Sequence, residues 1–216
     1  MGIKFTVNEN FFSGWTPDMS YVLGFFYADG TMIDDKVSRG KYVRFINTDR
    51  DILNGIRDAL GSKHNIYATK MPWPRKTKYV LSIGNKQLYK GLSNMGLVPN
   101  KSLVVTIPSI PPQYIHDFVR GYFDGDGCIH VEKTKKLLRV IFTSGSFAFL
   151  IGLAEIISSA NNIKIKKVYS SRRAFQLRYN QNDSLKILSS IYKNAKPGLY
   201  LERKNKIFEN FKKTRM

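Results

Sequence analysis

Two ten-residue stretches of the chain, YVLGFFYADG (Tyr21–Gly30) and FVRGYFDGDG (Phe118–Gly127), align without a gap. Each begins with an aromatic residue and valine, has a glycine at the same position, continues with an aromatic pair, and ends in aspartate and glycine. The two aspartates, Asp29 and Asp126, are separated by roughly the length of a small domain. One copy alone is compatible with a tight turn or a helix end, whereas two copies at this spacing favour a duplication.

The segments that follow the two copies repeat one order of predicted elements. Alternation of apolar and polar residues predicts strands, and apolar residues at helical spacing predict helices. After the first copy the pattern predicts two strands, the second at 41–48, then a helix at 49–61, strands at 65–71 and 77–84, and a helix at 86–96. After the second copy it predicts strands at 128–134 and 137–144, a helix at 146–162, strands at 163–169 and 173–180, and a helix at 182–195.

This repeated order predicts an α+β protein made of two pseudo-symmetric αββαββα halves. Between them lies VVTIPSIPP (104–112), whose three prolines cannot continue a helix or a central strand. We therefore expect a first half at residues 1–103, a linker at 104–112 and a second half at 113–216.

The two copies are expected to form helices, at Pro17–Asp29 and Pro112–Asp126, each ended by the glycine that follows. Small residues recur four apart within them, on one face of each helix, where they allow two backbones to approach closely. These residues are Gly24, Ala28, Gly121 and Gly125. Packing through this face would bring Asp29 and Asp126 together at one end of the helix pair.

Two carboxylates at helix C-termini are electrostatically unfavourable, because each faces the negative end of a helix dipole and repels the other. Such a pair would either have a raised pKa or require a cation. Carboxylate and backbone carbonyl oxygens suit Mg²⁺, which keeps several waters and completes its shell with phosphate oxygens. A divalent ion at this point would polarise a phosphate and help to generate hydroxide from water.

The charge of the chain points to a polyanionic partner. Among 216 residues there are 35 Lys and Arg against 16 Asp and Glu, a formal net charge of +19, which favours nucleic acid, DNA or RNA, over a membrane surface. The single cysteine excludes an internal disulfide and a cysteine-based zinc cluster. No signal-peptide core and no apolar run of about 18 residues occurs, so we expect a soluble protein, with its compartment left open.

The paired motifs are similar to the LAGLIDADG motif, and the chain resembles a single-chain, two-motif LAGLIDADG homing endonuclease, a monomeric meganuclease, over about residues 12–212. The resemblance implies two saddle-shaped, four-stranded antiparallel sheets covered by helices, packed through two central motif helices and lying in the DNA major groove. It also implies hydrolysis of phosphodiesters on both strands of a specific, pseudo-palindromic duplex of about two helical turns.

The same resemblance assigns roles by position in the motif. Asp29 and Asp126 are the expected metal-binding catalytic acids, aided by the backbone carbonyls of Ala28 and Gly125. The implied cofactor is Mg²⁺, with about two or three divalent ions in the active complex and with Mn²⁺ or Ca²⁺ able to replace it in binding. Lys101 and Lys204 match the basic active-site position, near a scissile phosphate or an attacking water.

Some positions depart from the motif. Asp124 keeps the first acid of the motif in the second half, whereas Tyr27 replaces it in the first half. This difference predicts asymmetry between the halves. Arg120 replaces a small residue and is expected to point away from the helix interface. The polar strand-end position of the family corresponds to Asp49 and Ser146; both suit helix N-caps, and neither is assigned chemistry.

Alternation also predicts which side chains face DNA, because residues opposite the apolar face of each strand point away from the helices. Arginine and glutamine on that face suit guanine and adenine edges, and lysines suit phosphates. The predicted DNA-binding residues are Arg44, Ile46, Lys76, Lys78, Ser82, His130, Arg139, Thr143, Lys164, Lys166, Arg172, Gln176 and Arg178.

Two other functions remain open on the sequence. An RNA-binding maturase that assists intron splicing would use the same scaffold and need neither aspartate. A DNA-binding regulator that has lost cleavage would keep the basic sheets, but both Asp-Gly pairs and both lysines are present, which favours the endonuclease.

Overall fold

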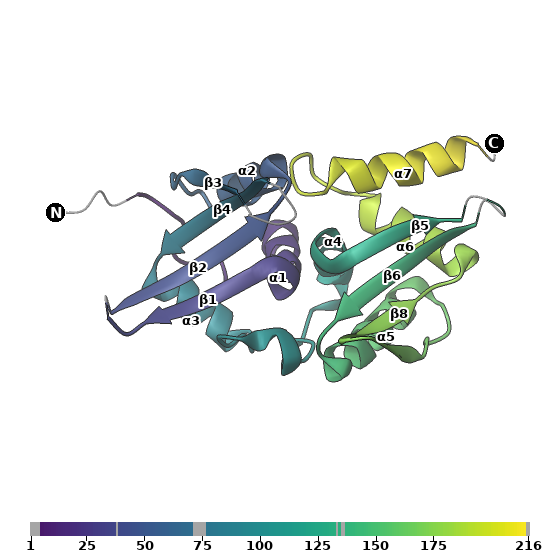
Figure 1. The fold of residues 1–216 in the computed structure, drawn as a ribbon, viewed down its shortest axis with the longest axis horizontal. Helices are drawn as coiled ribbons and strands as arrows, with labels where there is room; N and C mark the ends of the chain where they lie inside the picture. Colours follow the sequence, from purple (N-terminus) through teal and green to yellow (C-terminus); the bar gives the residue numbers. More distant parts are fainter. Residues whose placement is uncertain (1–4, 38, 71–76, 133, 135–136, 215–216) are drawn as a thin grey trace.

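The computed structural model of the chain describes residues 5–37, 39–70, 77–132, 134 and 137–214. Two halves lie side by side, each built on one four-stranded sheet, and they meet through helices α1 (Pro17–Asp29) and α4 (Ile115–Asp126) (Figure 1). The predicted α+β fold with two pseudo-symmetric αββαββα halves is confirmed.

Both sheets are antiparallel and share one topology, with strand orders β1-β2-β4-β3 and β5-β6-β8-β7. The first half contains β1 (Gly30–Asp35), β2 (Gly40–Asn47), α2 (Arg50–Ala59), β3 (Ile66–Lys70), β4 (Thr77–Gly84), α3 (Lys86–Asn94) and the 3₁₀ turn η1 (Lys101–Leu103). The second half contains the 3₁₀ turn η2 (Pro112–Tyr114), β5 (Gly127–Val131), β6 (Leu138–Ser144), α5 (Phe147–Asn161), β7 (Val168–Ser171), β8 (Ala174–Arg178), α6 (Gln181–Tyr192) and α7 (Glu202–Lys213). Residues 105–111, inside the predicted linker, form neither helix nor strand.

The alternation read from the sequence decides which face of each sheet meets the helices. In β2, Val43 and Phe45 are fully buried while Arg44 between them is partly exposed. In β6, Leu138 and Val140 are fully buried while Arg139 is exposed. Burial of the apolar face against the helices supplies the stabilising free energy. The opposite face of each sheet, which is polar and basic, is left free of helices.

Three details of the predicted elements differ in the structure. Residues 163–167 are not a strand, although they alternate, because the backbone N–H and C=O of Ile163 bond to Ser158 and close the end of α5. The second motif helix begins at Ile115, because Pro112 starts a separate 3₁₀ turn. An additional helix, α7, follows the second αββαββα unit.

The two motif helices touch backbone to backbone where glycine replaces a side chain. A methyl group on Gly24 would lie 2.1 Å from the carbonyl oxygen of Phe118, and one on Gly121 would lie 2.0 Å from that of Tyr21. The helices thus cross at a distance that only glycine permits at these two positions. Further along, a methyl group on Gly125 would lie 2.3 Å from Ala28 Cβ.

The glycines that end the motif helices are their C-caps, as expected, but neither adopts the left-handed conformation common for glycine at that position. Gly30 and Gly127 both have φ of −90°, in the extended region open to every residue. A methyl group on Gly30 would lie 2.3 Å from the ring of Phe26, and one on Gly127 would lie 2.2 Å from the ring of Phe123. Glycine is required here by the close approach of a phenylalanine, which lets the helix turn directly into the first strand.

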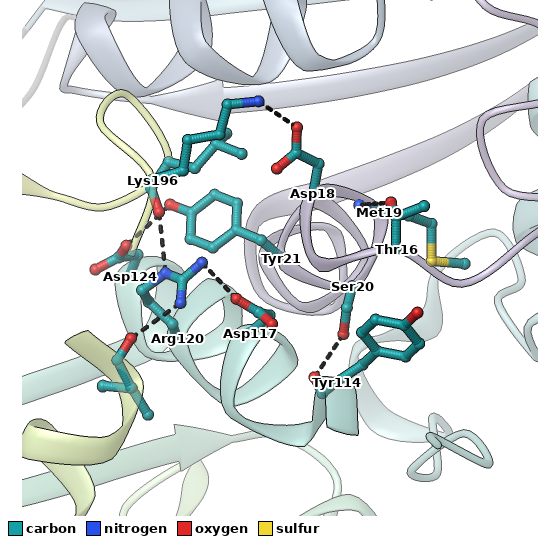
Figure 2. Close-up of polar contacts among 12 residues, drawn as sticks. Thr16, Asp18, Met19, Ser20, Tyr21, Tyr114, Asp117, Arg120, Asp124 and Lys196 are labelled. Carbon is teal, nitrogen blue, oxygen red and sulfur yellow. Dashed lines mark hydrogen bonds and ion pairs between the residues drawn. The ribbon is translucent and has the colours of Figure 1, made fainter. Parts of the chain in front are cut away.

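A buried polar network joins α4 to α1 and to the segment before α7 (Figure 2). Asp124 is fully buried and accepts hydrogen bonds from Tyr21 Oη (2.9 Å) and from the backbone N–H of Leu201 (3.0 Å). Arg120 forms an ion pair with Asp117 (2.8 Å). Arg120 also donates to the carbonyls of Leu199 (3.0 Å) and Ile191 (2.9 Å), away from α1 as expected, although its guanidinium lies 5.0 Å from the ring centroid of Tyr21.

In the part of the chain that the structure describes, no helix combines the length and the apolar character needed to cross a membrane.

The position of Tyr27 confirms the expected asymmetry, since its hydroxyl donates to the carbonyl of Met95 (2.6 Å) whereas Asp124, at the matching position, binds Tyr21 and Leu201.

Candidate active site

The C-terminal ends of α1 and α4 bring two carboxylates together. A methyl group on Gly125, the residue before Asp126, would lie 3.5 Å from Asp29 Cγ. The pKa of Asp126 is raised to about 6. Desolvation by the surrounding protein is the largest cause of this rise and the charge of Asp29 is the second, while Lys101 and Lys204 oppose it. The duplicated helices therefore place Asp29 and Asp126 close enough to repel, as the sequence predicts.

Asp29 is held by an amide that sequence reasoning missed. Asn47, the last residue of β2, donates from Nδ2 to Asp29 Oδ2 (2.9 Å), and its Oδ1 accepts from the backbone N–H of Asp49 (2.9 Å). Burial raises the pKa of Asp29, and the Asn47 hydrogen bond, followed by Lys204 and Lys101, counteracts that rise.

The matching position in the second half is Ser144, which accepts from the backbone N–H of Ser146 (3.1 Å). The polar strand-end position therefore lies two residues earlier than the sequence assignment to Asp49 and Ser146. Those two residues are the N-caps of α2 and α5, as expected. Serine is shorter than asparagine, and Asp126 has no hydrogen bond with any residue that the structure describes.

Lys101 and Lys204 occupy different environments although their positions match. Lys101 is buried at the start of η1 with its ammonium 5.9 Å from the ring centroid of Phe26. Burial lowers the pKa of Lys101, while Asp126 and Asp29 act in the opposite direction. Its ammonium has no hydrogen-bond acceptor among the described residues, so it is available to an anion near the two carboxylates.

The ammonium of Lys204 is instead used within the protein. It donates to the backbone carbonyls of Phe123, Asp124 (2.9 Å) and Gly127 (2.6 Å), which lie where α4 ends and β5 begins. Burial lowers the pKa of Lys204 to about 8. An ammonium has three N–H donors, and all three are engaged, so Lys204 neutralises and fixes the end of α4.

An open pocket of ≈ 430 Å³ lies beside Asp29. Its walls include Asp29, Asn47 and Lys101, and also Ala28 and Gly125, whose backbone carbonyls are the expected metal ligands. Two further cations line it, Lys78 from β4 and Arg203 from α7. Arg203 was not predicted, because nothing in the sequence indicates that α7 of the second half reaches a pocket of the first. The pocket joins a carboxylate, oxygen donors and cations, the combination that a phosphate and a divalent cation require.

The donors present fit a magnesium-type ion. Carboxylate oxygens of Asp29 and Asp126 and the adjacent carbonyls of Ala28 and Gly125 are hard oxygen ligands, and the charge of Asp29 contributes to the raised pKa of Asp126. Among the described residues, no three His, Cys, Asp or Glu side chains gather into a metal-holding group. Water and substrate oxygens would therefore complete the shell.

Most of the predicted DNA-facing residues lie on the helix-free faces of the sheets. Arg44 and Ile46 are on β2, Lys78 and Ser82 on β4, His130 on β5, Arg139 and Thr143 on β6, and Gln176 and Arg178 on β8. Arg178 donates to Gln176 Oε1 through Nε (3.0 Å) and Nη2 (2.7 Å), which fixes the two side chains as a pair.

Three predicted DNA-facing residues lie elsewhere, and a fourth falls outside the described part of the chain. Arg172 is in the turn between β7 and β8 with φ of 53°. Lys164 and Lys166 precede β7 in an irregular segment, and Lys166 forms an ion pair with Asp183 of α6 (2.6 Å), so it faces the helix layer. Lys76 lies outside the residues that the structure describes.

Comparison with known proteins agrees with this geometry. A sequence profile described as a LAGLIDADG-like domain matches residues 16–96 and 113–214, one match for each half. The chain belongs to the LAGLIDADG family.

Solved LAGLIDADG structures share the fold. The homing endonuclease I-DmoI in complex with DNA and Mn superposes with a TM-score of 0.56 at 18% identity, covering 81% of this chain and 96% of that chain. The meganuclease I-AabMI bound to uncleaved DNA gives 0.61 at 16% identity, covering 93% and 90%. The N-terminal LAGLIDADG domain of WhiA gives 0.57 at 15% identity, covering 93% of each chain.

Two curated relatives from Methanocaldococcus jannaschii match over a small part of their length. The DNA-directed RNA polymerase subunit Rpo1C is 29% identical over 153 residues, which is 69% of this chain and 16% of that protein. The probable translation initiation factor IF-2 is 28% identical over 204 residues, which is 88% of this chain and 16% of that protein. The LAGLIDADG chain thus corresponds to a minor segment of each.

Affinity for a divalent ion is expected to rise by about tenfold between pH 5 and pH 7. The pKa of Asp126 is raised to about 6, so its carboxyl is mainly protonated at pH 5, is mainly charged at pH 7, and must lose its proton to bind a metal ion. Mn²⁺ binding to the protein, followed by electron paramagnetic resonance at both pH values, measures the change. The Asp126→Asn variant should show a smaller pH dependence than the wild type, because only Asp29 is left to titrate; equal affinity of the wild type at pH 5 and pH 7 would contradict the prediction.

Proposed function

We propose that this chain is a divalent-metal-dependent, site-specific DNA endonuclease that cuts both strands of its target. The observation that carries the proposal is the pair of aspartates at the ends of two helices in backbone contact, with basic sheet faces on both sides. Such a pair is costly for the fold and is useful for a reaction at phosphate.

The chemistry follows from the environment of each side chain. Asp29 and Asp126 would hold divalent ions with the carbonyls of Ala28 and Gly125, each aspartate serving one strand. A bound ion supplies charge stabilisation at the phosphate and lowers the pKa of a water molecule. Asn47 orients Asp29, and the unpaired ammonium of Lys101 stabilises negative charge that develops on the phosphate oxygens.

The helix-free sheet faces account for the choice of target. Arg44 on β2 and the Gln176–Arg178 pair on β8 would read base edges in the major groove, while lysines would hold phosphates. The two faces differ in sequence, so the target should be pseudo-palindromic and about two helical turns long, bound by one copy of the chain.

A randomised duplex library tests the proposal. The purified chain is incubated with the library in Mg²⁺ or in EDTA, and the new ends are sequenced. We expect one family of related double-strand breaks with 3′ overhangs, present only with Mg²⁺. Enrichment of DNA sequences without new ends would identify a DNA-binding regulator instead, and tight binding of structured intron RNA with no DNA enrichment would identify a maturase.

Asn47→Ala is expected to lower the cleavage rate by about tenfold, because removing an outer-shell partner of a metal-binding carboxylate typically costs that much or more. Asn47 donates to Asp29, whereas Ser144 makes no hydrogen bond with Asp126 in the described structure. Ser144→Ala is therefore the matched control and should change the rate by no more than about twofold. Equal effects of the two substitutions, measured as single-turnover rates on the selected target, would show that Asn47 does not position Asp29.

A further inference from the structure

The pocket beside Asp29 is lined by more positively charged side chains than negatively charged ones. Three positively charged side chains, Lys78, Lys101 and Arg203, line it together with one carboxylate, Asp29. They come from β4, η1 and α7, so two belong to the first half and one to the second. An excess of positive charge around a single carboxylate forms a site for an anion rather than for a metal ion alone.

Arg203 has no equivalent in the other half. The matched lysines, Lys101 and Lys204, are preceded by Asn100 and Arg203, and asparagine cannot provide a guanidinium. Arg203 is exposed, and no hydrogen bond or ion pair to a described residue engages its guanidinium. The planar fork of arginine binds two oxygens of one phosphate, which a lysine ammonium cannot do.

The surroundings of the two carboxylates differ in two further respects. Asp29 accepts a hydrogen bond from Asn47, whereas Asp126 has no such partner among the described residues. The donors of Lys204 are occupied by three carbonyls, so this lysine does not replace the missing guanidinium. The site at Asp29 is therefore the better prepared of the two to bind a phosphate.

We propose that Arg203 reaches across from the second half to bind the scissile phosphate of the strand served by Asp29, and that this strand is cut first. The inference rests on the proposed endonuclease function. Arg203 acts on the substrate phosphate itself, together with Lys101, and makes the two cleavage steps unequal.

Strand-resolved kinetics tests the role of Arg203. The two scissile positions are first mapped with the wild type on the selected target, and each strand is then labelled separately. Arg203→Ala is expected to slow the cleavage of one strand by about 10²-fold, the effect of removing one donor to a reacting oxyanion, with little change on the other. Nicked duplex should therefore accumulate. Arg203→Lys should recover part of the rate, and Lys206→Ala, which removes an exposed cation from the same helix, should show no strand preference.

Binding in Ca²⁺ provides a second readout that does not depend on cleavage. Arg203→Ala should bind the unmodified target more weakly than the wild type. A neutral methylphosphonate at one of the two scissile positions should remove this difference, and at the other position should leave it unchanged. Equal slowing of both strands, no slowing of either, or an affinity difference that persists with both methylphosphonates would overturn the proposal. Failure of the wild type to cut any duplex would remove the endonuclease function itself, and is seen before any variant is compared.

Discussion

Asp126→Asn is expected to reduce double-strand cleavage by about 10³-fold or more while leaving the fold and DNA binding intact. Asparagine has nearly the same size as aspartate but lacks the charge that a divalent ion requires. Asp126 makes no hydrogen bond with a described residue, and the charge of Asp29 opposes its ionisation, so the loss of its charge relieves repulsion. The cleavage rate should therefore fall while the free energy of unfolding rises.

The measurement is cleavage of a supercoiled plasmid that carries the selected target, with DNA affinity measured separately in Ca²⁺. Asp29→Asn should have an effect of similar size, and Asp58→Asn, on the exposed surface of α2, should have none. Accumulation of nicked plasmid would show that each aspartate serves one strand, whereas loss of nicking as well would show that the two carboxylates act as one site. Double-strand cleavage by Asp126→Asn at the wild-type rate would falsify the assignment of this residue.

The sequence was sufficient for the architecture because the information is periodic and local. Alternation placed Val43, Phe45, Leu138 and Val140 on the buried faces, and the repeated order of elements after Asp29 and Asp126 predicted both halves. Alternation failed at residues 163–167, where the backbone of Ile163 was already used to end α5. A pattern of side chains does not reveal which backbone groups are free to pair.

The site was predicted only where chemistry coincided with the repeat. Asp29, Asp126 and Lys101 follow from it, whereas Asn47 and Arg203 depend on contacts between distant segments. Both Asn47 and Asp49 have side chains suited to bonding a backbone N–H two residues later, so the sequence alone could not show which of them also meets Asp29. Lys204 matches Lys101 by position, but its environment is set by the approach of α7 to the end of α4.

Gly121→Ala is expected to lower the free energy of unfolding by about 3 kcal/mol, the upper part of the usual range for an overpacked core. The sign is informative because alanine favours an isolated helix over glycine by about 1 kcal/mol. Here a methyl group would lie 2.0 Å from the carbonyl oxygen of Tyr21 and 2.7 Å from the backbone nitrogen of Phe25. Both are backbone atoms inside α1, so no side-chain rotation relieves the contact, and the helices must separate.

Urea unfolding of Gly121→Ala beside the wild type measures this loss, and Gly14→Ala is the matched control because a methyl group at Gly14 meets nothing within 4 Å. Since α1 and α4 also carry Asp29 and Asp126, the fraction of Gly121→Ala that remains folded should cleave DNA more slowly than the wild type. A Gly121→Ala protein at least as stable as the wild type would mean that helix propensity outweighs the steric term. The two motif helices would then not be in backbone contact at this position, and the pairing of the carboxylates would need another cause.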